Sequence, residues 1–325
     1  MTRRCVMKND RRHKDMKYRE LMDLLEQIAP TEYYEDEDNS GIQVHDGKEE
    51  VNRVLVCLEM NDAVLEEAAE KKADMIITHH PLLFHPLSKV DPGDPASRYV
   101  IGAVRNGIDI YSSHLPFDAA ARGNNMYLAE LLKLQDVAIP DSWDEEDYGY
   151  EEDEKYNESI DADSHFVAPR ASFGSGAPKV RLVINDDDTE YEYDEDEIGS
   201  IGYLPKAMSF QQFQTYVERC LDLPRHYVRC VDGGREEIRK VAFCTGAGGE
   251  YIFTAVRQGC DAYITGDLKL HEAQFAKASG LTVIDAGHYG TEKIFTENMA
   301  AQLRAKAGDA LEVIEAEANT NPYTL

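Results

Sequence analysis

The chain has 325 residues, of which 42% are hydrophobic, and this is enough for two domains of ordinary size or for one large α/β unit with an insertion. Its formal net charge of −28 argues against direct binding of nucleic acid, because proteins that bind the phosphate backbone need a basic surface. No apolar run approaches the roughly 18 residues of a membrane span. The six cysteines form no C-x-x-C pair, which favours a reduced, cytoplasmic compartment.

The first part of the chain alternates between predicted helices and predicted strands. Residues 1–15 are basic and lack the apolar segment of a signal peptide, so we interpret them as a short extension before a domain that begins at Met16. The hydrophobic pattern then predicts buried strands and connecting helices: strands over 51–60, 73–80 and 107–118 with its exit loop, and helices over 17–30, 61–72, 95–107 and 124–134. Strands and helices in this order indicate βαβ units and therefore a parallel sheet.

The same order of elements returns after residue 200: strands over 240–245, 260–267, 281–288 and 310–318, and helices over 209–224, 246–259, 270–280 and 291–306. Between the two parts, residues 141–197 carry 21 Asp and Glu against 4 Lys and Arg, a net charge of −17. This stretch has too few aliphatic residues to offset its ordering entropy by burial. We interpret residues 141–200 as an acidic, solvated insertion, whose end could form a strand pair over 179–185 and 189–204.

The two halves also resemble each other position by position. Residues 54–78 align on residues 241–265 with one offset of 187 (265 − 78) and no gap. The following strand aligns with an offset of 174 (288 − 114), so the first half has 13 more residues (187 − 174), most simply in the loop after His80. We interpret this pattern as an internal repeat, with a first α/β half at 16–140 and a second at 201–325.

Functional side chains in open α/β sheets gather at the carboxyl ends of the strands. Here those positions carry four histidines and several carboxylates: His79 and His80, then His114 and Asp118, and in the second half Asp267, Asp285, His288 and Glu292. Imidazole with carboxylate is a ligand set for Zn²⁺, Mn²⁺, Fe²⁺ or Ni²⁺, and a bridging carboxylate lets two ions lie roughly 3.5–4 Å apart. Because each half has a strand that ends in H-x-x-x-acid, we predict a dinuclear metal site.

Simpler interpretations exist for the single motifs. The His79 and His80 pair could cap a strand end by hydrogen bonding to backbone carbonyls, as many histidines do. The segment GAGGE at 246–250 lies between a strand and a helix, where it could bind a phosphate or make a tight turn. We interpret His85 as a surface or supporting residue, since it stands in a loop outside the repeat.

Four separated blocks resemble one known family. IITHHPLLFHPL, HLPFDAAARGNNMYLAELL, VAFCTGAGGEYI, and YITGD followed by DAGHYGTEKIF are similar to motifs of the Nif-three-like dinuclear metal-centre family, often labelled GTP cyclohydrolase I type 2. EDEDNSGIQV is similar to the N-terminal signature of that family, with Glu37 where a tryptophan is common. The resemblance covers about residues 16–140 and 200–325.

The resemblance implies two similar α/β halves that face each other across two divalent metal ions, assembled as a toroidal homohexamer. It implies that the metal ligands are His79, His80, Asp118, His288 and Glu292, and it leaves His114 as a supporting or catalytic residue. Zn, Fe, Mn and Ni all suit such a ligand set, so the native metal stays open. Some members carry a folded domain between the halves, where this chain has only the acidic insertion, so functions tied to that domain are not carried over.

The label of the family implies hydrolysis of GTP with release of formate, by water that two metal ions activate. We therefore expect a metal-dependent hydrolase that acts on a nucleotide or another small molecule, with His114 as the proton carrier. The alternative is a non-enzymatic, ring-shaped metal-binding protein for metal storage, metal insertion or regulation through protein partners. In that case the acidic insertion would be a docking tail.

Overall fold

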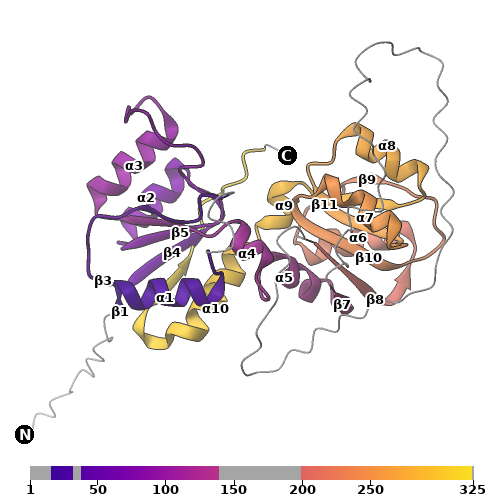
Figure 1. Cartoon of the computed structure of the whole chain (residues 1–325), viewed down its shortest axis with the longest axis horizontal. Helices are drawn as coiled ribbons and strands as arrows, with labels where there is room; N and C mark the ends of the chain where they lie inside the picture. The colour runs from indigo at the N-terminus through magenta and orange to yellow at the C-terminus, as the bar shows by residue number, and fades with distance from the viewer. Residues whose placement is uncertain (1–15, 32–37, 139–198, 324–325) are drawn as a thin grey trace, which may run out of the picture.

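The computed structural model describes residues 16–31, 38–138 and 199–323. Within these ranges, the strands form two larger sheets and one small two-stranded sheet, and helices lie against the larger sheets (Figure 1). The first sheet has the strand order β13-β4-β5-β6-β2, and the second has the order β7-β8-β10-β11-β12-β9. Each sheet with its helices is called a unit below. The α/β architecture predicted from the sequence is confirmed.

The first unit is built on three neighbouring parallel strands, with helices in the connections between them. Its elements up to the end of the third strand are β1 (Met16–Lys17), α1 (Tyr18–Ile28), β2 (Gly41–Val44), β3 (Glu50–Val51), β4 (Arg53–Cys57), α2 (Asp62–Glu70), β5 (Met75–Thr78), α3 (Pro95–Asn106) and β6 (Asp109–Ser112). β4, β5 and β6 pair in parallel, and β2 pairs antiparallel at the edge beside β6. β1 and β3 form the small antiparallel sheet.

The second unit repeats this arrangement with β10, β11 and β12 as its parallel strands. Its elements from residue 200 are β8 (Ser200–Met208), α6 (Phe210–Cys220), β9 (Arg229–Val231), β10 (Ile238–Ala247), a 3-10 turn (Gly249–Tyr251), α7 (Ile252–Arg257), β11 (Ala262–Gly266), α8 (Leu270–Ala278), β12 (Thr282–Asp285) and α9 (His288–Glu292). β8 and β9 pair antiparallel with β10 and β12. A helix α4 (Leu115–Ala119) follows β6 as α9 follows β12.

The two units exchange their last helix and strand. After α4, the chain forms α5 (Asn124–Leu131) and β7 (Gln135–Ala138), which pack on and pair with the second sheet. After α9, it forms α10 (Phe295–Ala307) and β13 (Glu312–Glu315), and β13 pairs in parallel with β4 of the first sheet. The chain therefore crosses between the units immediately after each of the two H-x-x-x-acid motifs. The predicted boundary near residue 140 separates the two copies of the sequence repeat, but it does not separate the two units of the structure. Each unit contains one helix and one strand from the other half of the sequence.

The repeat is visible in individual backbone contacts. The carboxylate of Asp74 accepts hydrogen bonds of 2.8 and 2.9 Å from the amides of Asn52 and Arg53. The carboxylate of Asp261, 187 residues later, accepts the same pair of bonds, 3.0 and 2.9 Å long, from the amides of residues 239–240. Each aspartate thus ties the start of its own strand to the start of the neighbouring strand. These equivalent bonds confirm that the two halves share one structural plan.

Local sequence explains where several helices begin and which face they bury. α1 places Leu21, Leu25 and Ile28 on one face at spacings of four and three residues, and all three are buried. α2 begins at Asn61, whose side chain accepts a hydrogen bond of 2.8 Å from the amide of Val64. The helix predicted at 291–306 is divided in the structure, because the chain leaves the second unit at the end of α9 and enters the first unit with α10.

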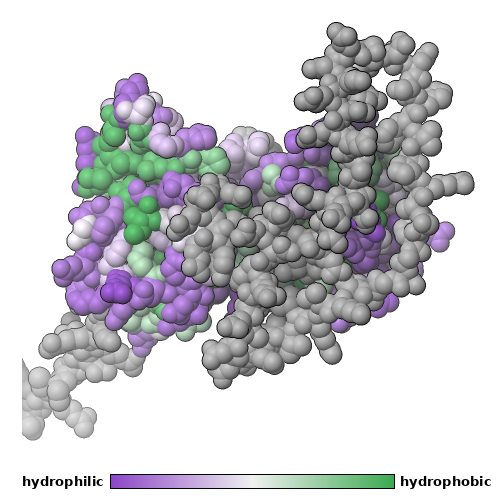
Figure 2. Space-filling model, in the orientation of Figure 1, coloured by the Kyte–Doolittle hydropathy of each residue, from purple (hydrophilic) through white to green (hydrophobic). Residues whose placement is uncertain are grey.

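Several predicted segments lie outside the described residues: the extension at 1–15, Glu37, nearly all of the acidic insertion, and the expected strand at 179–185. The end of the insertion forms part of β8, whose partners are β10 and β7. Among the described residues, no helix has the length and apolar character that a bilayer crossing needs. Figure 2 shows a mostly hydrophilic face on the first unit, with one apolar patch in its upper part.

The exchange of α10 predicts a specific stability defect. Leu303 on α10 is fully buried in the core of the first unit. Leu303→Ala should lower the free energy of unfolding by about 2–5 kcal/mol, because it removes apolar contacts and leaves a cavity. Urea denaturation measures this loss. Leu270→Ala, at a side chain that is 76% exposed, is the control and should change stability by less than about 0.5 kcal/mol. Equal effects of the two substitutions would contradict the packing of α10.

Candidate metal centre

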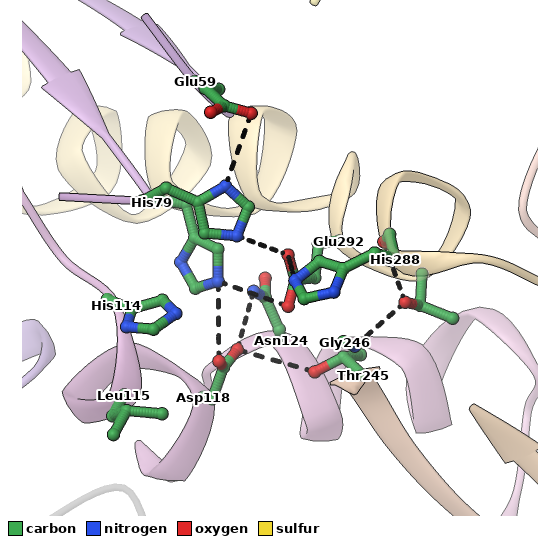
Figure 3. A network of polar contacts seen from close by, with 12 residues as sticks. Glu59, His79, His114, Leu115, Asp118, Asn124, Thr245, Gly246, His288 and Glu292 are labelled. Carbon is green, nitrogen blue, oxygen red and sulfur yellow. Dashed lines mark hydrogen bonds and ion pairs between the residues drawn. The ribbon is translucent and has the colours of Figure 1, made fainter. Parts of the chain in front are cut away.

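Side chains from both units converge where the carboxyl ends of β5 and β6 face α9 (Figure 3). His79 and His80 follow β5 directly, and their backbone amides both donate to the carbonyl of Leu58, at 3.1 and 3.3 Å. The chain therefore turns out of the sheet at this point, and Pro81 follows. In a continuing strand the two rings would point to opposite faces. The turn lets both imidazoles reach the same site.

Glu292 lies at the centre of the cluster and is 2% exposed. Its Oε2 atom lies 2.9 Å from Nε2 of His80 and 3.1 Å from Nε2 of His288. Its Oε1 atom lies 3.7 Å from Nε2 of His79. Because Glu292 and His288 are four residues apart on α9, they present their side chains on the same face. One carboxylate is thus surrounded by three imidazoles from both halves of the chain.

His79 is fully buried and has a fixed orientation. Its Nδ1 atom lies 2.8 Å from the backbone carbonyl of Ser113, which can only accept a hydrogen bond, so Nδ1 carries the proton. Its Nε2 atom lies 3.4 Å from Oδ2 of Asp118. Within the described structure, Nε2 of His79 and Oε2 of Glu292 are buried atoms that make no hydrogen bond. The two side chains make ion pairs with one another and with Asp118, His80 and His288, so these atoms face a common space lined by imidazole and carboxylate groups.

His114 and Asp118 come from the loop after β6 and from α4. Nδ1 of His114 lies 2.8 Å from the carboxylate of Asp38, and its ring centre is 5.2 Å from that of His79. Asp118 is nearly buried, and its Oδ1 atom accepts a hydrogen bond of 2.8 Å from the side-chain amide of Asn124. This bond leaves the second oxygen of Asp118 facing His79.

His288 and His80 form the more exposed side of the cluster, with exposed fractions of 34% and 23%. Nδ1 of His288 lies 2.8 Å from the carboxylate of Asp267, and Nδ1 of His80 lies 3.7 Å from that of Glu59. All four imidazoles therefore have Nδ1 near an oxygen. This is the usual environment of metal-binding histidines, whose second nitrogen is held by a carboxylate or a carbonyl.

Gly246, at the end of β10, leaves the space that Glu292 occupies. A Cβ atom at this position would lie 2.3 Å from Oε1 of Glu292, and the backbone has a φ of +70°. The amides of Gly246 and Gly248 donate hydrogen bonds of 3.0 Å to the hydroxyls of Thr291 and Thr265. These two amides are already used within the protein, which favours the tight-turn interpretation of GAGGE over a phosphate cradle.

The electrostatic environment keeps Glu292 ionised and favours protonated imidazoles in the absence of metal. Burial would raise the pKa of Glu292, but His79 and His288 hold that pKa well below its usual value. Burial would lower the pKa of His288, but Glu292 and Asp267 raise it to about 9. The pKa of His79 is likewise raised well above its usual value, against the effect of burial, by Asp118 and Glu292. A cation in this space would replace these protons.

The ligand atoms form overlapping groups that suit metal ions. In this cluster, atoms within 4.8 Å of one another form three sets: His79 with His80 and His114, His79 with Asp118 and Glu292, and His80 with His288 and Glu292. Mixed imidazole and carboxylate donors suit Zn²⁺, Fe²⁺, Mn²⁺ and Ni²⁺. The donors present and their closeness therefore fit metal binding, and Glu292 belongs to two of the sets.

All six residues singled out as ligands or catalyst in the sequence are brought together: His79, His80, His114, Asp118, His288 and Glu292. Asp285 is not among them, because its carboxylate accepts from Arg229 and from the amides of Leu268 and Gly287. Asp267 supports His288. Sequence reasoning missed Asp38 and Glu59, whose roles depend on contacts distant in the chain. For Asp38 one signal was available, because it lies in the N-terminal motif EDEDNSGIQV.

Comparison with known proteins agrees with this architecture. A GTP cyclohydrolase 1 type 2 homolog of Bacillus subtilis is 28% identical, over 96% of this chain and 99% of the relative. A protein of the same name from Nostoc sp. is 29% identical over 78% of each chain. Their names carry the same label that the sequence motifs suggested.

Solved structures show the same fold. A hypothetical protein of Staphylococcus aureus superposes with a TM-score of 0.75 and 24% identity, over 96% of this chain and 100% of that one. A Bacillus cereus protein related to NIF3 gives a TM-score of 0.74 and 24% identity, over 96% and 99%. The family DUF34/NIF3, described as NGG1p interacting factor 3, matches residues 16–322. Because this match spans nearly the whole chain, the protein belongs to the DUF34/NIF3 family.

Proposed function

We propose that this protein binds two divalent metal ions in the cluster around Glu292 and acts as a metal-dependent hydrolase on a small molecule of the nucleotide class. The observation that carries the proposal is the buried carboxylate of Glu292, whose oxygens lie 2.9–3.7 Å from the Nε2 atoms of three imidazoles from both halves. In the absence of metal, protonated imidazoles balance this buried charge, and a cation shared by the same donors would take the place of their protons. The name of the curated relatives supports the nucleotide class of substrate.

The ligand sets support two metal positions that share Glu292. The interior position would use His79 and Asp118, and the outer position would use His80 and His288. His114 groups with His79 and His80, and we assign it to the interior position because its ring centre lies 5.2 Å from that of His79 and 5.4 Å from that of His80. When bound, two such ions act as Lewis acids and lower the pKa of water to near neutrality. We first expected His114 to carry protons. Its closeness to His79 and its bond to the buried Asp38 support a ligand role better.

The chain itself would exclude water on one side of the site and admit substrate on the other. His79 packs against the ring of Phe295 with ring centres 4.9 Å apart, and both residues are fully buried. On the opposite side, Asp267 and Glu59 are 52% and 55% exposed. A substrate would therefore approach from the side of Asp267 and Glu59. Metal-activated water at a site closed on its inner side is a common arrangement in hydrolases.

The homohexamer and the cytoplasmic location stay predictions from the resemblance and from composition. The exposed apolar side chains of the first unit, such as Ile42, Phe84 and Val104, support contacts with other chains. They do not indicate how many chains assemble.

Metal content tests the site directly. Glu292→Gln keeps the size of the side chain but removes the charge that both positions share, so metal content should fall from about two ions per chain to below one. Elemental analysis after dialysis against Zn²⁺ measures this change. Glu317→Gln, at a side chain that is 86% exposed, is the matched control and should retain the metal content of the wild type. Full retention of two ions in Glu292→Gln would contradict the proposal.

Metal uptake should release protons. The raised pKa of His288, about 9, means that this imidazole is protonated at pH 7 before metal arrives and must lose its proton on binding. Affinity should therefore weaken as pH falls from 9 to 6, by about tenfold per pH unit for each proton displaced. Calorimetric titration with Zn²⁺ in two buffers of different ionisation enthalpy counts the protons. Binding that is independent of pH in this range would place the metal elsewhere.

Measuring substrate turnover tests the proposed hydrolase activity separately from metal binding. Protein loaded with two ions should release formate from GTP, or phosphate from a nucleotide in a panel, and Glu292→Gln should abolish this release. Formate and phosphate assays measure the products. Loaded protein that releases neither product would overturn the hydrolase proposal and favour metal storage or delivery. Equal release by Glu292→Gln would show that a contaminant or another site is responsible.

A further inference from the structure

The ligand sets separate His114 from His288. His114 groups with His79 and His80, whereas His288 groups with His80 and Glu292. In the part of the chain that the structure describes, no such set contains both His114 and His288. His80 belongs to both sets, and its ring centre lies 5.4 Å from that of His114 and 5.3 Å from that of His288. His114 also lies beside the fully buried His79, with ring centres 5.2 Å apart, whereas His288 is on the more exposed side. The two histidines are held by different carboxylates, Asp38 for His114 and Asp267 for His288.

The support of His114 is a buried carboxylate. The side chain of Asp38 is 1% exposed, and its Oδ1 atom lies 2.8 Å from Nδ1 of His114. Its Oδ2 atom accepts hydrogen bonds from the hydroxyl of Ser40 and, at 3.3 Å, from the amide of Leu115. The hydroxyl of Ser40 in turn accepts a bond of 3.0 Å from the amide of His114. Both the backbone and the ring of His114 are thus fixed by the segment that begins at Asp38.

The support of His288 is an exposed carboxylate at an unusual backbone position. Asp267 is 52% exposed, and its Oδ2 atom lies 2.8 Å from Nδ1 of His288. It has a φ of +55°, which a residue other than glycine adopts at an energetic cost. In the internal repeat, Asp267 occupies the position of His80 (267 − 80 = 187). At this position of the repeat, the first half thus has His80, a proposed metal ligand, whereas the second half has Asp267, which orients the proposed ligand His288.

A hydrogen bond from Nδ1 to a carboxylate has a defined effect on an imidazole. It fixes the tautomer that leaves Nε2 free, holds the ring plane and raises the basicity of Nε2. The other two imidazoles are held differently, His79 by the carbonyl of Ser113 and His80 by Glu59 at 3.7 Å. Direct carboxylate support at hydrogen-bond distance therefore occurs once at each end of the cluster.

We propose that Asp38 and Asp267 are positioning residues that act on separate metal positions, Asp38 on the interior one through His114 and Asp267 on the outer one through His288. The inference rests on the proposed two-metal site and adds a separate control of each ion. Loss of such a supporting carboxylate typically costs 10–100-fold in metal affinity. Each loss should be confined to one of the two ions.

The test compares Asp38→Asn, Asp267→Asn and their double variant with the full-length wild type, all first stripped with a chelator. Titration with Co²⁺ and Zn²⁺ against a competing chromophoric chelator gives the affinity of each ion, and the visible spectrum of Co²⁺ reports its ligand set. Each single variant should weaken one ion by about 10–100-fold and leave the other within about twofold of the wild type. The Co²⁺ spectrum of the ion that each variant retains should differ between them, and the double variant should weaken both ions.

Asp62→Asn is the matched control, because Asp62 is 66% exposed and pairs only at the surface with Arg98. Unchanged affinity for both ions in Asp38→Asn and Asp267→Asn would overturn the inference. So would a weakening of both ions in each single variant with the same residual spectrum, since that pattern reports a general loss of structure. Thermal unfolding of the metal-free variants detects such a loss independently.

Two further outcomes separate the inference from the proposal that it rests on. If the wild type binds fewer than two ions, the two-metal site itself fails. If Asp38→Asn does not fold, because Asp38 also supports the start of α4, the exposed Asp267 still decides: Asp267→Asn must weaken one ion and spare the other. An effect of Asp267→Asn on both ions, or on neither, would reject the separate control of each position.

Discussion

The burial of one carboxylate among imidazoles is the constraint on which the rest of this structure depends. Glu292 is 2% exposed, and an unpaired charge at such a depth would be very costly. His80 and His79 from the first half and His288 from the second approach it, so both units must meet at this point. Gly246 must lack a side chain for the same reason, because a Cβ atom would collide with the carboxylate.

The exchange of α5–β7 and α10–β13 holds the two units in the position that this cluster needs. Each exchanged helix starts a few residues after an H-x-x-x-acid motif. The motif that ends at Asp118 precedes α5, and the motif that ends at Glu292 precedes α10. His114, Asp118, His288 and Glu292 therefore lie where the chain crosses between the units, and the packed helices fix both crossings, whereas His79 and His80 follow β5 within the first unit. Phe295 shows the connection, since it is part of the first core and also packs against the ring of His79.

Much of the cluster was predictable because it depends on short-range patterns. A buried strand that ends in His79 and His80, and two H-x-x-x-acid motifs at matching places of a repeat, are visible in one sequence. The supports of the ligands were not predictable in this way. Asp38 reaches His114 across 76 residues (114 − 38), and no periodicity relates them. The exchange of α10 could not be predicted from the sequence either, because the pattern of an amphipathic helix does not specify which of two similar sheets the helix covers.

The sequence by itself determined the α/β class, the internal repeat, the six side chains that form the cluster and the membership of a family, because these follow from hydrophobic periodicity and from motifs read locally. Only the tertiary structure decided which sheet each exchanged element joins, which carboxylate holds which histidine, and that GAGGE is a turn whose amides are already bonded. Those facts depend on contacts between residues far apart in the chain. Such contacts are selected by packing and by the need to pair buried charges, which no local pattern records.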